Sequence, residues 1–120
     1  CFEKAVIVFS GHYGSAGNSI ILLDMASSTR LQRVIACYCH LEEIYDHVGD
    51  IVTQSEAIGY MGGTGLTPHQ YGAHLHYSIN ILEKDVSVLK GISGHGARNP
   101  FDMGLQNIQF APSVQYDKVI

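Results

Sequence analysis

The chain has 120 residues and a net charge of −4 with neutral histidines, a size that suits one domain. It is 46% hydrophobic and 15% charged, enough apolar material for a core and too little charge for a disordered chain. The seven basic residues are scattered and form no stripe, which argues against nucleic acid as a partner. No apolar run is long enough to span a membrane.

The first residue is Cys1 rather than Met, so we expect the natural N-terminus to lie upstream of this chain. Cys37 and Cys39 are two residues apart on an expected strand, and their side chains point the same way, which disfavours a bridge between them. A disulfide from Cys1 to one of them and buried free thiols both remain open. The cysteines therefore do not settle the compartment.

Short strands and tight turns are expected along the first half of the chain. The β-rich runs predict strands over residues 5–10, 19–24 and 31–40, with a glycine-rich turn at 11–18 and a polar turn at 25–30. The second and third strands form a hairpin. Residues 41–45 are expected to hold a single helical turn.

The second half continues this pattern. We expect short strands at 48–52 and 57–61, a glycine-rich loop at 62–72, an alternating strand at 73–81 and a last strand at 86–89. Asn99 and Pro100 begin a helical turn that Gly104 ends. The predicted class is all-β, a twisted and mainly antiparallel sheet with at most short helical turns.

The strongest chemical signal is His74-Leu75-His76 on the alternating strand. Its period of two places both imidazoles on one face, roughly 6.6 Å apart, which suits a shared metal or a ligand beside a base. Two solvated histidines on a wet face is the competing interpretation. His40 ends the strand over 31–40, and its value depends on lying close to His74 and His76.

Other chemistries are weaker. His12, His47, His69 and His95 look like turn or surface residues, with His69 notable because its loop leads into His74. Strand alternation places Cys39 and His40 on opposite faces, a poor arrangement for a nucleophile and its base. There is no G-x-S-x-G elbow, no P-loop and no paired carboxylate constellation.

Several motifs in the right order resemble the M23 family of zinc metallopeptidases, the lysostaphin-type or LytM-type endopeptidases. The similarity covers residues 5 to about 105. It rests on Gly14-x-x-Gly17-Asn18, Tyr38-x-His40-Leu41, Val48-Gly49-Asp50-x-Val52, Ile58-Gly59, Gly63-Thr64-Gly65, Gly72-Ala73-His74-Leu75-His76-Tyr77 and Asn99-Pro100.

The resemblance implies a LytM-like sheet (the duplicated hybrid motif) lining a narrow groove, and a zinc ion held in part by His76. It assigns His40 and His74 catalytic roles beside the metal, activating water and stabilising the oxyanion. The hairpin at 11–18 and the loop at 62–72 would wall the groove. The expected groove residues are Tyr13, Asn18, His69 and Tyr71.

One departure from the family pattern concerns the zinc ligands. The other two zinc ligands of the family come from an H-x-x-x-D motif, and no histidine here is followed by Asp four residues later. Either that motif lies upstream of Cys1 or this copy has lost it. We expect residues 1–105 to form the peptidase core and residues 106–120 a tail, with an upstream segment supplying the missing ligands.

The expected function is zinc-dependent cleavage of cross-links or stem peptides of bacterial peptidoglycan, in an extracytoplasmic or phage-associated setting. The first alternative is an inactive relative that binds cell-wall peptides or regulates another wall hydrolase. The second is a phosphocarrier or lipoyl-type module, because residues 48–59 also resemble the hammerhead of those barrels. The H-x-H spacing fits the peptidase better.

Overall fold

The structure, a computed structural model, describes residues 2–99 and the backbone of 118–119. Its β-strands form one sheet in which every strand pair is antiparallel. The strands are β1 (Lys4–His12), β2 (Asn18–Asp24), β3 (Gln32–Ile44), β4 (Ile51–Thr53), β5 (Gly59–Met61), β6 (His76–Glu83), β7 (Ala97–Arg98) and β8 (Lys118–Val119). The α-helix is the single turn α1 (Leu89–Ile92), and a 3₁₀ turn covers Gly14–Ala16.

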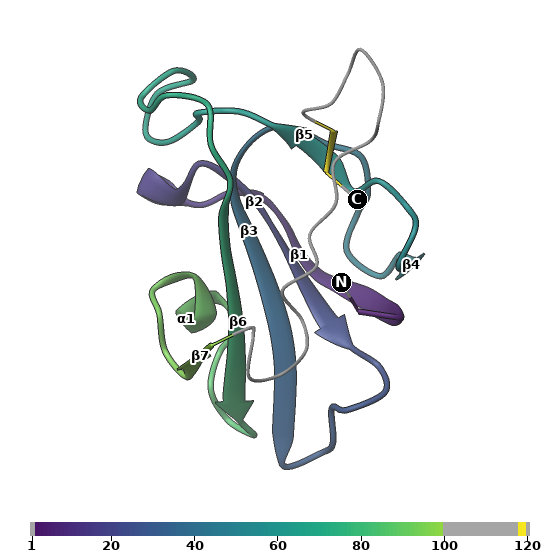
Figure 1. Cartoon of the computed structure of the whole chain (residues 1–120). Helices are drawn as coiled ribbons and strands as arrows, with labels where there is room; N and C mark the ends of the chain where they lie inside the picture. Colours follow the sequence, from purple (N-terminus) through teal and green to yellow (C-terminus); the bar gives the residue numbers. More distant parts are fainter. Residues whose placement is uncertain (1, 100–117, 120) are drawn as a thin grey trace.

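The long strand β3 organises the sheet (Figure 1). On one edge it pairs with β2, and on the other it pairs first with β6, over Gln32 to Cys39, and then with β5, from Leu41 onward. The change of partner falls at His40. The order β4-β1-β2-β3-β5-β8 completes the sheet, with β7 beside β6.

Both faces of β3 are buried, and each packs against its own apolar cluster. Val34, Ala36 and Tyr38 belong to one cluster, with side chains from β1, β2, β4 and β6. Ile35 and Cys37 belong to the other, which α1 and its flanking residues cover. Alternation along a strand explains this division.

Most of the predicted elements are present, and the all-β, antiparallel class is confirmed. The hairpin of the second and third predicted strands is the β2–β3 pair. None of the helices in the described residues is long and apolar enough to cross a membrane.

Two local predictions are wrong. The residues expected to form a helical turn at 41–45 instead continue β3 to Ile44, because they pair with β5. The expected strand at 86–89 is instead the approach to α1, whose apolar side chains Val86, Val88 and Leu89 cover the cluster around Ile35 and Cys37.

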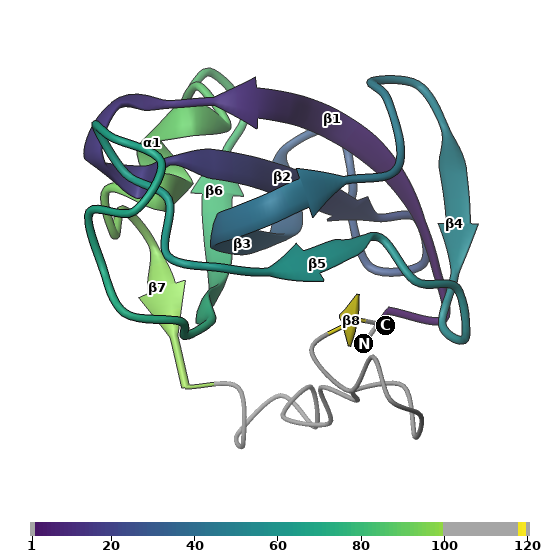
Figure 2. The same cartoon turned by 90° about the horizontal axis from the view of Figure 1, so that it is seen from above.

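The helical turn expected after Asn99 and most of the expected tail at 106–120 lie outside the described residues. Figure 1 shows the turn between β1 and β2 and the loop between β5 and β6 at one end of the sheet, with α1 on the sheet beside β6, and Figure 2 shows all three on the same side of the molecule. That end carries the candidate site.

Candidate functional site: a pocket lined by three histidines

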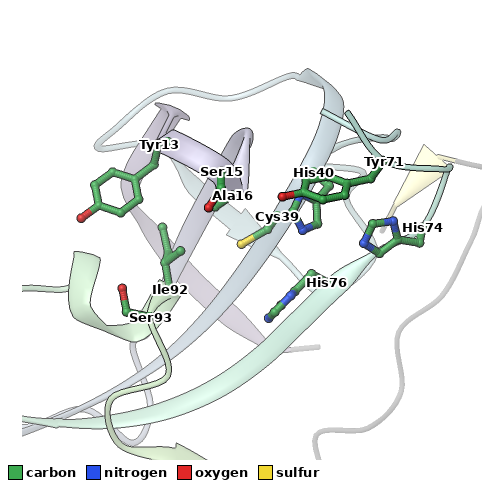
Figure 3. Close-up of a pocket in the computed structure, with 11 residues that line it drawn as sticks. Tyr13, Ser15, Ala16, Cys39, His40, Tyr71, His74, His76, Ile92 and Ser93 are labelled. Atoms are coloured by element: carbon green, nitrogen blue, oxygen red, sulfur yellow. The ribbon is translucent and has the colours of Figure 1, made fainter. Parts of the chain in front are cut away.

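Three imidazoles meet at this end of the sheet. The ring centroid of His40 lies 4.7 Å from that of His74 and 5.8 Å from that of His76. The three rings line a pocket of about 500 Å³ together with Tyr13, Tyr71 and Cys39, which we call the histidine pocket (Figure 3). His40 therefore lies close to His74 and His76, as a shared site requires, whereas the roles of the three residues remain predictions.

Strand alternation alone would have kept His40 out of this pocket. Cys39 pairs directly with His76, so their side chains lie on one face of the sheet, and the next residue of a regular strand would point to the other face. His40 has a φ of 63°, the left-handed region that residues other than glycine seldom adopt. This one residue turns the chain, and its ring enters the same pocket as Cys39.

The prediction that Cys39 and His40 face opposite ways is therefore wrong. Both line the histidine pocket, and the reason is the left-handed backbone of His40. Cys39 is nevertheless poorly suited to act as a nucleophile. Burial raises the pKa of its thiol and a hydrogen bond with Ser19 opposes this, with a net upward shift that disfavours the thiolate.

Hydrogen bonds fix the tautomers of two rings. Nδ1 of His40 lies 2.8 Å from the Thr64 carbonyl oxygen, and Nδ1 of His74 lies 2.7 Å from that of Gly72. Because a carbonyl only accepts, each Nδ1 must carry the proton that it donates. In the neutral rings Nε2 is then the nitrogen with a free lone pair.

His40 is the buried member of the group, with 8% of its surface exposed, while His74 and His76 are exposed. Burial lowers its pKa, the hydrogen bond to Thr64 opposes that change, and the nearby His74 and His76 lower the pKa further. We therefore expect a neutral His40 ring at neutral pH.

Thr64 holds three segments together next to His40, a role that the sequence did not reveal. Its hydroxyl donates to the Leu41 carbonyl at 2.8 Å and accepts from the Asn18 backbone at 3.0 Å, while its own carbonyl accepts from His40. Gly17 makes this contact possible, since a Cβ there would meet the Thr64 carbonyl oxygen at 2.3 Å. Thr64 thus joins the hairpin, β3 and the loop.

The predicted groove residues divide between two cavities. Tyr13 and Tyr71 line the histidine pocket, and the Tyr71 ring packs against His40 with centroids 4.7 Å apart. Asn18 and His69 instead line a second cavity of about 460 Å³, formed with the part of the loop that precedes Tyr71. Their assignment to the groove stays a prediction.

Apart from residues of the hairpin at 11–18, which was expected to wall the groove, three residues of the histidine pocket were not foreseen: Cys39, Ile92 and Ser93. Ile92 and Ser93 come from α1 and the residue after it, which had been expected to follow a last strand. The only available signal was the pattern of Val86, Val88, Leu89 and Ile92, which is apolar without clean alternation.

The fit of the described residues to a metal ion is partial. A neutral imidazole such as that of His76 is a suitable zinc ligand. Within residues 2–99, however, no group of three or more His, Cys, Asp or Glu side chains is arranged to hold a metal ion. These residues do not by themselves make a zinc site.

Comparison with known proteins decides the family. The model of peptidase family M23 matches residues 2–88, well over half of the chain. The chain belongs to peptidase family M23. The phosphocarrier or lipoyl-type alternative is set aside on this ground, and a comparison with curated protein sequences finds no match.

Solved structures of the M23 family share the fold. The catalytic domain of the antimicrobial peptidase lysostaphin from Staphylococcus simulans is 25% identical with a TM-score of 0.62, over 88% of this chain and 67% of that one. A putative glycyl-glycine endopeptidase LytM from Ruminococcus gnavus is 21% identical with a TM-score of 0.62, over 82% and 36% of the two chains.

A zinc-containing peptidase from Vibrio cholerae is 22% identical with a TM-score of 0.51, and the match covers 68% of this chain but only 22% of that one. The present chain therefore spans only part of several matched proteins. Together these structures confirm the predicted lysostaphin-type or LytM-type fold.

Proposed function

We propose that this M23 domain belongs to a zinc-dependent endopeptidase that cleaves cross-links or stem peptides of peptidoglycan. The observation that supports the proposal most directly is the convergence of His40, His74 and His76 in one pocket at the end of the sheet. Its family membership and its similarity to the lysostaphin catalytic domain support the peptidase chemistry. Such a substrate implies an extracytoplasmic or phage-associated protein.

His76 is the residue that we propose as a zinc ligand. Since the described residues offer no complete set of donors, the proposal requires further ligands from residues outside them, for which we propose a segment upstream. When bound, zinc supplies a Lewis acid that polarises a peptide carbonyl and makes a bound water more acidic. The protein's own residues must supply the proton transfers.

His40 and His74 are the proposed catalytic residues. Each has its Nδ1 proton engaged with a backbone carbonyl, which leaves Nε2 able to accept a proton from an attacking water. A ring that has taken up a proton at Nε2 can then donate a hydrogen bond to a developing oxyanion or to the leaving amine. Two such rings in one pocket allow both roles to be filled.

The test uses the full-length protein with zinc added and purified peptidoglycan peptides as substrates, with release of new amino termini as the readout. We expect one zinc per M23 domain and loss of cleavage with a chelator. His74→Ala should lower kcat by roughly 10²-fold or more. His47→Ala is the matched control, because the His47 side chain is 91% exposed and lies outside the histidine pocket.

The described residues hold no complete set of zinc ligands, and this favours one alternative function. The alternative is a metal-free M23 module that binds wall peptides or regulates another hydrolase. It predicts no stoichiometric zinc and no cleavage by the full-length protein, but retention of the protein on peptidoglycan. In that case His74→Ala would change binding to peptidoglycan without any catalytic effect. Zinc content and cleavage measured together separate the two functions.

A further inference from the structure

One wall of the histidine pocket comes from a segment that the family match does not include. The match ends at residue 88, whereas Ile92 and Ser93 line the pocket from α1 and the position after it. Figure 3 shows both residues and Tyr13 at one end of the pocket and the three imidazoles at the other. An occupant that reaches the histidines therefore has this wall beside it.

The position of this wall is fixed by packing. Gly91 lies against β3 so closely that a Cβ there would meet Cδ1 of Ile35 at 2.6 Å and Sγ of Cys37 at 3.2 Å. Leu89 and Ile92 pack on the apolar cluster that contains these two residues. The helical turn thus rests directly on the sheet.

Polar contacts fix the two ends of the same segment. The buried Asn80 side chain donates to the His95 carbonyl at 2.8 Å, and the His95 ring lies 3.1 Å from a carboxylate oxygen of Glu83. At the start of the segment, the Arg33 guanidinium donates to the carbonyl oxygens of Glu83 and Val86. A segment that is held at both ends and in its middle forms a rigid wall, and a rigid wall can distinguish peptide side chains by their shape.

The chemistry of the pocket is uncharged at this end. None of the described residues that line it is Asp, Glu, Lys or Arg. Ile92 and the Tyr13 ring offer apolar surface, and the hydroxyls of Tyr13, Ser15 and Ser93 are uncharged polar groups. Such walls favour an uncharged side chain and leave an ionised one without a partner.

We propose that Ile92 and Ser93, with Tyr13, form a side-chain subsite that selects a peptide residue with an uncharged side chain, of which alanine has the smallest, near the bond that is cut. This inference rests on the proposed peptidase function. It makes Ile92 and Ser93 specificity-determining residues, and it predicts that peptides made only of glycine are the poorer substrates.

The test is a set of blocked pentapeptides. The parent is pentaglycine, and each other member carries one L-alanine or D-alanine in place of one glycine. For the zinc-loaded full-length protein, we expect at least one alanine peptide to have a kcat/KM about fourfold above pentaglycine, the effect of burying one methyl group.

Ile92→Phe fills the subsite and should bring the kcat/KM values of the alanine peptides and of pentaglycine to a ratio of about one. Lys90→Phe is the matched control, since Lys90 is on the same helical turn, exposed and outside the pocket, and it should keep the wild-type preference. Because Ile92 also packs on the core, Ser93→Phe decides the matter if the melting temperature of Ile92→Phe falls. Equal preferences in the filled variants and the control would overturn the proposal, as would a wild-type protein that does not prefer any alanine peptide.

Failure of the proposed function is distinguished by a binding arm. If the wild-type protein cleaves none of the peptides, the same set is titrated and followed by NMR. The subsite then predicts an alanine peptide with a Kd about fourfold below that of pentaglycine and with the larger shifts at the Ile92 and Ser93 amides. Equal affinities, or shifts elsewhere only, would overturn the inference independently of catalysis.

Discussion

His40 has a backbone conformation that a strand residue seldom adopts, and the candidate site depends on it. Because its φ is 63°, its side chain enters the same pocket as that of Cys39, whereas a regular strand would place it on the opposite face. At this residue the pairing partner of β3 changes from β6 to β5. A left-handed residue with a Cβ costs about 1–2 kcal/mol, and histidine tolerates it better than branched residues do. The surrounding hydrogen bonds, led by that to Thr64, must outweigh this cost.

A pair of substitutions at this position tests the backbone conformation. His40→Gly and His40→Ala both remove the imidazole, but only glycine adopts a φ of 63° without strain. We expect His40→Gly to have the higher free energy of unfolding, by about 1 kcal/mol. Urea denaturation of both variants measures this difference. An alanine variant as stable as the glycine variant would show that the backbone is not held in the left-handed region.

Thr64 supports the site through its hydroxyl, which bonds both Leu41 and Asn18. Thr64→Val keeps the shape of the side chain but removes the hydroxyl that donates to the Leu41 carbonyl and accepts from the Asn18 backbone, so we expect the free energy of unfolding to fall by about 1–3 kcal/mol. Thr64→Ser keeps the hydroxyl and should lose less. Chemical denaturation checks the order of the two variants. Equal losses would mean that the methyl group, and not the hydroxyl, matters.

The strand β3 is buried on both faces. The ionisable side chains on it are therefore harder to deprotonate than they would be in water. Burial raises the pKa of the Cys37 thiol from 9.0 to about 12, with a hydrogen bond to Ser78 opposing the shift and Cys39 adding to it. Burial also raises the pKa of Tyr38 and of its neighbour Tyr77. All of these groups are neutral in the folded sheet at physiological pH.

The raised pKa values predict alkaline unfolding. A group whose pKa is higher in the folded state stabilises the fold fully below its unfolded pKa and ceases to do so as the pH rises toward its folded pKa. For Cys37 this window runs from pH 9.0 to about 12, and within it one group changes the free energy of unfolding by about 1.4 kcal/mol per pH unit. Guanidinium denaturation of the wild type and of Cys37→Ala, at several pH values in this window, should show a shallower decline for the variant. Parallel declines would contradict a buried neutral thiol at this position.

The elements that sequence could predict are those with a β-rich run or clean alternation. β1, β2 and the first part of β3 are β-rich apolar runs, β6 alternates, and the long loop follows from its glycines. The continuation of β3 past His40 could not be predicted, because one left-handed residue resets the alternation without a signal in the residue types. The helical turn α1 was missed for a different reason, since its four residues are too few to show a helical period.

At the scale of the whole molecule, the site is a product of topology. His40 comes from β3 and His76 from β6, and the antiparallel pairing of these strands brings them together across a sequence separation that local patterns do not resolve. The H-x-H spacing indicated His74 and His76, and the family resemblance added the expected roles of all three histidines. The sequence motifs did not reveal Thr64, Cys39, Ile92 or Ser93, whose importance depends on contacts between segments.

We expect the His40 imidazole to take part in peptide cleavage in the histidine pocket. His40→Asn tests it most directly, because asparagine tolerates the left-handed backbone and the ring alone is lost. The measurement is kcat/KM for a peptidoglycan peptide with the full-length protein, at confirmed zinc content, beside the exposed control His47→Asn. We expect a fall of roughly 10²-fold or more for His40→Asn and no change for the control. Rates for His40→Asn within about threefold of the wild type, with zinc fully bound, would rule out a catalytic role of the His40 ring.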